Sequence, residues 1–185
     1  LVQIATRGLA PRMYTGRLFI SDPTASNSPQ VMPVSLLISP PTPMNVQGWG
    51  GLPFGQTNVP AGLTNAIAVA GGTSHSIALK ADGGVQAWGL NTGSQTNVPA
   101  DLTNAVSVAG GFAYSLALRN DGTVIAWGTN TYGQTNTQAS LTNAVAVAAC
   151  SNSSVALRSD GTVFVWGDNT YAQTNVPPGL SNVVS

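Results

Sequence analysis

His75 is the only histidine in the 185-residue sequence, and an imidazole can act as a general acid or base or bind a metal ion. The sequence repeats every 39 residues, and the positions equivalent to His75 hold Tyr114 and Ser153. Since two of the three repeats do without imidazole, the pattern favours a structural histidine that packs and hydrogen-bonds beside a strand. A catalytic or metal-binding His75 is the alternative.

Other side chains that could do chemistry also recur with the repeat. The aspartates could be metal ligands and the serines nucleophiles: Asp82, Asp121 and Asp160, and Ser76, Ser115 and Ser154. Each aspartate precedes a glycine, the pairing that a tight turn requires, and no serine has a paired base in the pattern. We therefore predict no catalytic, cofactor or metal site, and a protein that is not an enzyme.

The charge of the chain is too sparse for an anionic partner. Six basic and six acidic residues give no net charge, and charged residues make up 6% of the sequence. Nucleic acids and acidic membranes require clustered lysine and arginine, so both are excluded as partners. The single cysteine, Cys150, allows no intrachain disulfide, and we expect a buried, inert thiol.

Composition also bears on location. No apolar run approaches the roughly 20 residues needed to cross a bilayer, so we predict no membrane span in this segment. Small polar residues dominate and Lys80 is the only lysine, which favours an extracellular or cell-surface protein. The sequence starts with leucine and in mid-pattern, so it is expected to be part of a longer chain, and the lack of a signal peptide in this segment therefore decides nothing about location.

The repeat is the strongest signal. Tryptophan recurs at intervals of 39 residues, and Gln-Thr-Asn, leucine and Asp-Gly keep the same register. The tryptophans are Trp49, Trp88, Trp127 and Trp166. A period of this length is typical of repeat architectures, in which each unit needs neighbours to bury its apolar surface.

Each unit contains a β-hairpin. In one, Ser115 to Arg119 and Val124 to Trp127 flank Asp121-Gly122, a pair favoured in two-residue hairpin loops. That loop would place Leu118 opposite Ile125 and Leu116 opposite Trp127. The tryptophans are then expected to pack in the core against the leucines, although an aromatic binding surface is the alternative.

A further strand in each unit alternates alanine with larger apolar residues, as in Ala-Val-Ala-Val-Ala at 144 to 148. A strand with one wet face would carry polar residues at every second position, so both faces should be covered. Sheets stacked around an axis meet this need better than a parallel β-helix. We predict an all-β partial β-propeller at residues 46 to 185, with about three and a half blades.

Residues 44 to 185 resemble the regulator of chromosome condensation family. Gly71-Gly72-Thr73-Ser74-His75-Ser76-Ile77-Ala78-Leu79 is similar to its Gly-Gly-x-x-His-Ser-x-Ala-Leu motif, and Asp121 to Gly128 to its Asp-Gly-x-Val-x-x-Trp-Gly motif. The resemblance implies a seven-bladed propeller, with the remaining repeats in the same chain. The short units are similar to the compact repeats of bacterial surface and secreted proteins.

Residues 1 to 45 lack the repeat. Residues 14 to 21 and 31 to 39 are predicted strands of a β-hairpin, and they look like the closing strands of a bacterial immunoglobulin-like or BACON-type sandwich. We therefore divide the chain into sandwich strands at 1 to 39, a proline-rich linker at 40 to 45, and the propeller repeats.

The polar connections after each Trp-Gly pair are the predicted binding surface, because loops on a rigid scaffold usually carry recognition. The candidate partner-binding residues are Asn91, Asn130, Tyr132, Asn169 and Tyr171. The expected function is a recognition scaffold for a protein or a carbohydrate. The alternative, implied by the founding member of the family, is guanine-nucleotide exchange on a small GTPase. The constant spacing from Trp49 to Trp166 leaves no inserted loop for it.

Overall fold

The computed structural model describes residues 13–20, 30–37, 45–50, 53–138 and 140–184, and the side chains of these from residue 45 onward. The chain divides into two compact units, Leu1–Pro41 and Thr42–Ser185. All regular elements in the described residues are strands, so the all-β prediction is confirmed.

The first unit contains two strands, β1 (Met13–Ile20) and β2 (Gln30–Leu37). They pair antiparallel, from Met13 opposite Leu37 to Ile20 opposite Gln30. The two predicted strands are therefore present and paired. Most of the predicted linker, residues 40 to 44, lies outside the described residues.

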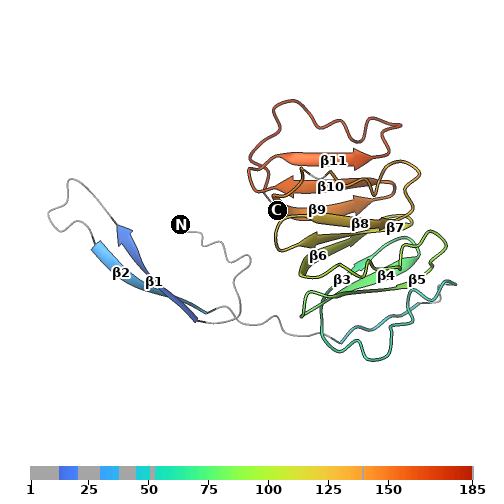
Figure 1. The fold of residues 1–185 in the computed structure, drawn as a ribbon, viewed down its shortest axis with the longest axis horizontal. Helices are drawn as coiled ribbons and strands as arrows, with labels where there is room; N and C mark the ends of the chain where they lie inside the picture. The colour runs from blue at the N-terminus through green and yellow to red at the C-terminus, as the bar shows by residue number, and fades with distance from the viewer. Residues whose placement is uncertain (1–12, 21–29, 38–44, 51–52, 139, 185) are drawn as a thin grey trace. The chain divides into compact units, whose positions relative to one another are not determined.

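The second unit holds three antiparallel sheets, each of three strands in chain order (Figure 1). The first sheet is β3 (Ala66–Gly71), β4 (His75–Lys80) and β5 (Val85–Gly89). The second is β6 (Ala105–Gly110), β7 (Tyr114–Arg119) and β8 (Val124–Gly128). The third is β9 (Ala144–Cys150), β10 (Ser153–Arg158) and β11 (Val163–Gly167). Each sheet is one blade.

The hairpin between β7 and β8 has a three-residue loop, so the predicted two-residue loop is wrong. Arg119 N–H donates to Thr123 O at 2.9 Å, and Gly122 N–H donates to Arg119 O at 3.1 Å. Gly122 has a φ of 84°, the left-handed conformation that three-residue hairpin loops require. Asp121 Oδ1 accepts both from Thr123 N at 2.9 Å and from Thr123 Oγ1 at 2.6 Å, which closes the loop.

The longer loop shifts the register by one residue. Leu118 pairs with Val124, Leu116 with Ala126, and Ser115 with Trp127. Because neighbours in a pair share a face, the tryptophan lies on the serine and alanine side of its sheet and not on the leucine side. The same holds for Trp88 opposite Ser76 and Trp166 opposite Ser154.

The blades stack by placing the leucine face of one against the alanine and tryptophan face of the next. One core cluster joins Leu116, Leu118 and Val124 of the second blade to Ala144, Ala156 and Trp166 of the third. A second cluster joins Leu79 of the first blade to Ala105, Ala117 and Trp127 of the second. Small alanines let the sheets approach closely, and the tryptophan fills the remaining space.

The prediction that both faces of each sheet are covered holds for the central strands and fails on the first strands. Leu116 and Ala117, on opposite faces of β7, are fully buried. Val69 on β3 and Val106 on β6 remain 54% and 42% exposed. None of the described residues belongs to a helix that is long and apolar enough to cross a membrane.

Candidate binding surface

A repeated hydrogen-bond arrangement fixes each connection against the blade that follows it. Gln95 O accepts from the indole Nε1 of Trp127 at 2.9 Å and from Ser115 Oγ at 2.8 Å. Gln56 and Gln134 use their carbonyl oxygens in the same way, toward Trp88 and Ser76 and toward Trp166 and Ser154. These serines and tryptophans therefore tie each connection to the blade that follows it.

His75 and Tyr114 make a second tie between blades. His75 Nε2 lies 3.0 Å from Ser115 Oγ, and Ser154 Oγ lies 3.1 Å from Tyr114 Oη. The Tyr114 hydroxyl also lies within hydrogen-bonding distance of the carbonyl oxygens of Cys150 and Ser153. Both rings are buried, and burial lowers the pKa of His75 and raises that of Tyr114. A neutral imidazole that faces a neighbouring blade fits the predicted structural role.

Most charged residues lie at or near the Asp-Gly turns, at one end of the stack of blades. Asp82 Oδ1 accepts from Gly84 N at 2.8 Å, and Asp160 Oδ1 accepts from Thr162 N at 2.9 Å. Bonds from the threonine hydroxyl and N–H lower the pKa of Asp121 and Asp160. Seven of the eight charged residues between residues 45 and 184 lie at these turns or bond to them: Lys80, Asp82, Asp101, Arg119, Asp121, Arg158 and Asp160.

Hydrogen bonds between residues of the same connection hold each polar connection in its conformation. Asn130 Nδ2 donates to Asn136 Oδ1 at 2.7 Å, and Asn130 Oδ1 accepts from Thr135 N at 2.9 Å. Asn91 and Asn169 make the same pair of bonds in their own loops. Three of the predicted partner-binding residues are thus exposed but already bonded within the protein.

Exposed aromatic rings stand on the opposite end from the Asp-Gly turns. Tyr132 and Tyr171 are 50% and 87% exposed, and Phe54, at the equivalent repeat position, is 47% exposed. In each of these loops the N–H of the aromatic residue donates to the Oε1 of the glutamine two residues later. Gly93 occupies the same position in the remaining loop, and its backbone lies beside Ala113 in the β6–β7 turn.

Phe112 belongs to the same end, because it lies in the β6–β7 turn and is 55% exposed. Phe54, Phe112, Tyr132 and Tyr171 together form what we call the aromatic end. Asp168 is the only charged residue of the described repeats on this side. The prediction missed Phe54, although its 39-residue spacing from Gly93 and Tyr132 was a usable signal. Phe112 has no aromatic equivalent at Thr73 or Ser151 and could not be found this way.

Two sequence expectations need correction. Cys150 is exposed rather than buried. Trp49 is 85% exposed, whereas Trp127 and Trp166 are 7% exposed and lie in the core as expected. Among the described residues, no three histidine, cysteine, aspartate or glutamate side chains gather where they could hold a metal ion.

Three segments of the chain match the family model described as "Regulator of chromosome condensation (RCC1) repeat": residues 66–95, 105–134 and 144–173. Each segment starts with the first strand of a blade and ends at a glutamine, at residue 95, 134 or 173. The carbonyls of the first two glutamines, Gln95 and Gln134, are the ones that bond the following blade. The matches therefore cover the sheets and the first part of each connection, which contains the exposed aromatic positions.

Solved structures show the same fold. Prp20p from Saccharomyces cerevisiae is 23% identical, with a TM-score of 0.52 over 62% of this chain and 33% of its own. Human WBSCR16 is 26% identical, with a TM-score of 0.51 over 64% of this chain and 38% of its own. The ectodomain of the receptor kinase CR4 from Physcomitrella patens is 23% identical, with a TM-score of 0.56 over 71% and 37%.

The chain thus spans about a third of the length of these structures. No curated protein sequence matches the chain. Prp20p itself has binding properties toward Gsp1p and histones. At this level of sequence identity, the similarity shows the propeller fold alone. The function of this chain has to be inferred from its own surface residues, because a shared fold does not imply a shared function.

Proposed function

The chain carries three regulator of chromosome condensation (RCC1) repeats, and from this premise we propose that it is part of a non-enzymatic propeller that binds a protein partner through the aromatic end. The observation that supports this proposal is the separation of the two ends of the stack. Charges gather at the Asp-Gly turns, while Phe112, Tyr132 and Tyr171 stand exposed at the other end.

The chemistry of the aromatic end favours a partner with little charge. Exposed tyrosines contribute contact area with few rotatable bonds, and clustered exposed apolar groups usually mark interaction sites. The asparagine bonds within each loop hold these rings on a stiff support, so little conformational entropy is lost on binding. A neutral carbohydrate could stack on the same rings, and the proposal ranks it second to a protein.

We extend the proposal to location: an extracellular or surface-exposed protein, of bacterial type, in which an immunoglobulin-like unit precedes the repeats. The composition supports an extracellular location, because the chain has a single lysine and its polar residues are mainly asparagine, threonine and serine. The paired strands β1 and β2 are compatible with the edge of a sandwich. Protease treatment of intact cells tests the location, since a surface protein is cleaved without lysis.

The binding test uses the whole chain, the double variant Tyr132→Ala/Tyr171→Ala, and the control Val106→Ala. Val106 is an exposed apolar residue on β6, away from the aromatic end. Each protein is immobilised and exposed to the surface proteins of the source cell and to an array of neutral glycans. A protein retained by wild type and control but lost from the double variant supports the proposal.

Equal retention by all three proteins would contradict it, and loss of glycan binding alone would favour the carbohydrate alternative. Nucleotide exchange is tested separately by the release of labelled GDP from a small GTPase. Catalysed release would replace this proposal with the exchange-factor function.

A further inference from the structure

Asp168 places one negative charge at the aromatic end. The equivalent positions in the two preceding connections hold Leu90 and Thr129, so the charge belongs to the third unit alone. Asp168 Oδ1 accepts from Thr170 N at 2.9 Å and from Thr170 Oγ1 at 2.6 Å. These bonds lower the pKa of Asp168 from its ordinary value of 3.8, so the carboxylate is charged at neutral pH. They also fix its orientation.

No basic side chain between residues 45 and 184 is paired with Asp168. Arg158 is at the opposite end of its blade, where its Cζ atom lies 5.3 Å from the centre of the Phe164 ring. The other two basic residues of these repeats pair at the Asp-Gly turns: Lys80 with Asp82 and Arg119 with Asp101. The described repeats therefore leave the charge of Asp168 available to a cation from outside.

The repeat places Tyr132 next to Asp168. One unit earlier, a Cβ built on Gly93 would collide with Thr129 Oγ1 in the following connection. Tyr132 follows Gly93 by 39 residues, and Asp168 follows Thr129 by the same interval. The side chain of Tyr132 therefore leaves the backbone beside Asp168, across the boundary between two connections.

Two more aromatic residues of this end lie around Asp168. Asp168 N–H donates to Asn152 O at 2.9 Å, and Phe112 N–H donates to Ser151 O at 2.8 Å. Phe112 and Asp168 are thus bound to adjacent residues of the β9–β10 turn. Tyr171 is three residues beyond Asp168 in the same connection and is 87% exposed. Exposed aromatic rings therefore surround a charged carboxylate.

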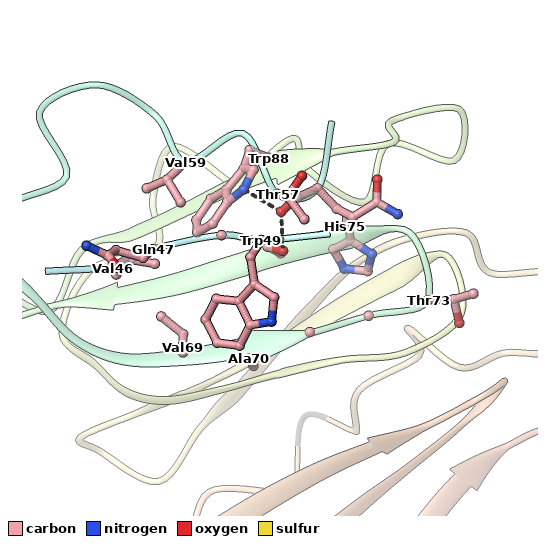
Figure 2. A pocket seen from close by; sticks show the side chains of 15 residues that line it. Val46, Gln47, Trp49, Thr57, Val59, Val69, Ala70, Thr73, His75 and Trp88 are labelled. Atoms are coloured by element: carbon pink, nitrogen blue, oxygen red, sulfur yellow. Dashed lines mark hydrogen bonds between the residues drawn. The ribbon is translucent and has the colours of Figure 1, made fainter. Parts of the chain in front are cut away.

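Aromatic residues also lie together at the first blade, but without an acidic neighbour. Figure 2 shows Trp49 and Trp88 beside a groove of about 340 Å³. None of the described residues that line this groove is aspartate or glutamate. The groove therefore gives no reason to expect a cationic ligand, in contrast to the surroundings of Asp168.

We propose that Asp168, together with Tyr132 and Tyr171, binds an arginine side chain of the partner protein. This inference rests on the proposed function, because it specifies the partner of the aromatic end. A guanidinium group is planar and weakly hydrated, so it can stack on a tyrosine ring while it donates to a carboxylate. A carboxylate has about four lone-pair sites, so the two bonds from Thr170 leave room for the guanidinium. Because the rest of this end is uncharged, the arginine would lie in an otherwise neutral segment of the partner.

The test uses short neutral peptides that each contain one arginine, and the same peptides with citrulline, which keeps the shape of the side chain without its charge. The whole chain carries an environment-sensitive fluorophore on Cys150, which is exposed and is the only cysteine. Cys150 ends β9 and adjoins the turn that bonds Phe112 and Asp168, so the fluorophore reports on this site. Calorimetry on the unlabelled protein measures the same affinities.

Asp168→Asn removes the charge and keeps an oxygen for Thr170. Asp160→Asn is the matched control, because Asp160 Oδ1 accepts the same two bonds from Thr162, at 2.9 and 2.6 Å, at the opposite end of the blade. We expect Asp168→Asn to weaken the binding of arginine peptides by about three- to tenfold and Asp160→Asn to leave it unchanged. Wild type should show a similar preference for arginine over citrulline, and added salt should reduce that preference.

Equal affinity of wild type for the arginine and citrulline peptides would overturn the inference, as would the same loss of affinity in both variants. Binding of no arginine peptide to the wild type would overturn it too. So would arginine-dependent binding that persists in Tyr132→Ala/Tyr171→Ala, because the rings would then take no part. The proposed function is judged separately, by whether that double variant loses a protein that the wild type retains.

Discussion

The ring of Tyr114 fills the space in which a side chain at Gly111 would have to lie. A Cβ built on Gly111 would collide with the Cδ1, Cε1 and Cζ atoms of that ring. Gly72 stands in the same relation to His75. In the third unit, where the ring is replaced by Ser153, the glycine is replaced by Cys150. The two positions vary together because they share one volume.

This relation predicts the effect of Gly111→Ala. The alanine should lower the free energy of unfolding by about 1–3 kcal/mol, because it overpacks a filled site against a ring that ties two blades. Gly71→Ala is the matched control, since a Cβ there meets no atom within 4 Å, and it should change stability by less than about 0.5 kcal/mol. Chemical denaturation measures both.

The same pair allows a double-mutant cycle. In a Tyr114→Ser background, which copies the third unit, Gly111→Ala should cost less than about 0.5 kcal/mol. A cost that is the same with and without the tyrosine ring would show that the glycine is needed for another reason.

Replacement of the core tryptophans should reveal the ties between blades. Trp127→Phe removes the indole N–H that donates to Gln95 O and should destabilise the protein by about 1–2 kcal/mol. Trp49→Phe is the control, because Trp49 is 85% exposed, and it should have little effect. Similar losses from both, measured by urea unfolding, would contradict the role assigned to the Gln95 tie.

The sequence predicted the repeat, the strands and the stacking of sheets, because periodic apolar residues and Asp-Gly pairs are signals carried by side chains. It misplaced Trp127 because Asp121-Gly122 fits both a two-residue and a three-residue loop. The bonds from Thr123 to Asp121 accompany the longer loop. The hydrogen bond from Trp127 to Gln95 could not be predicted for another reason. Its acceptor is a main-chain carbonyl, which every residue has, so the residue type at position 95 does not indicate the bond.

The candidate site was predicted in part for similar reasons. Tyr132 and Tyr171 were found as variable aromatic positions in polar loops. Asn130 was placed with them, but its amide bonds Asn136 and Thr135 across the loop, a pairing that composition alone does not reveal. Cys150 pairs with Ser153 and is exposed, whereas a free cysteine is usually buried, so residue type alone misplaced it.

Stability should depend on pH through His75. Ser115 Oγ donates to Gln95 O, so its hydroxyl is left to accept from Nε2–H of His75, while Nδ1 is buried without a partner. Burial holds the pKa of His75 below its ordinary value of 6.5. The unfolded state then binds a proton first as pH falls.

The sign follows from this difference. Stability from His75 is fully present above pH 6.5 and is lost as pH falls from there toward the lower pKa of the folded state, by at most about 1.4 kcal/mol per pH unit. His75→Tyr, which copies Tyr114, should remove this slope. Denaturation midpoints at several pH values between about 5 and 8 measure it, and an unchanged slope in the variant would refute the assignment.

Mutations in the polar loops should distinguish residues that stabilise the loop from residues that contact a partner. Asn130→Ala breaks two bonds that close the connection and should lower the unfolding free energy by about 0.5–1.5 kcal/mol, a modest value because the loop is exposed. Thr131→Ala, next to it and also exposed, is the control and should be neutral.

Tyr132→Ala and Tyr171→Ala should leave the melting temperature nearly unchanged, since both rings are at least half exposed. Partner binding should weaken in these two variants, whereas Asn130→Ala should weaken it only as far as it loosens the Tyr132 loop. Loss of folding on replacing either tyrosine, measured by thermal denaturation, would show that these rings support the stack. Of the aromatic end, only Phe54 and Phe112 would then remain as candidate partner-binding residues.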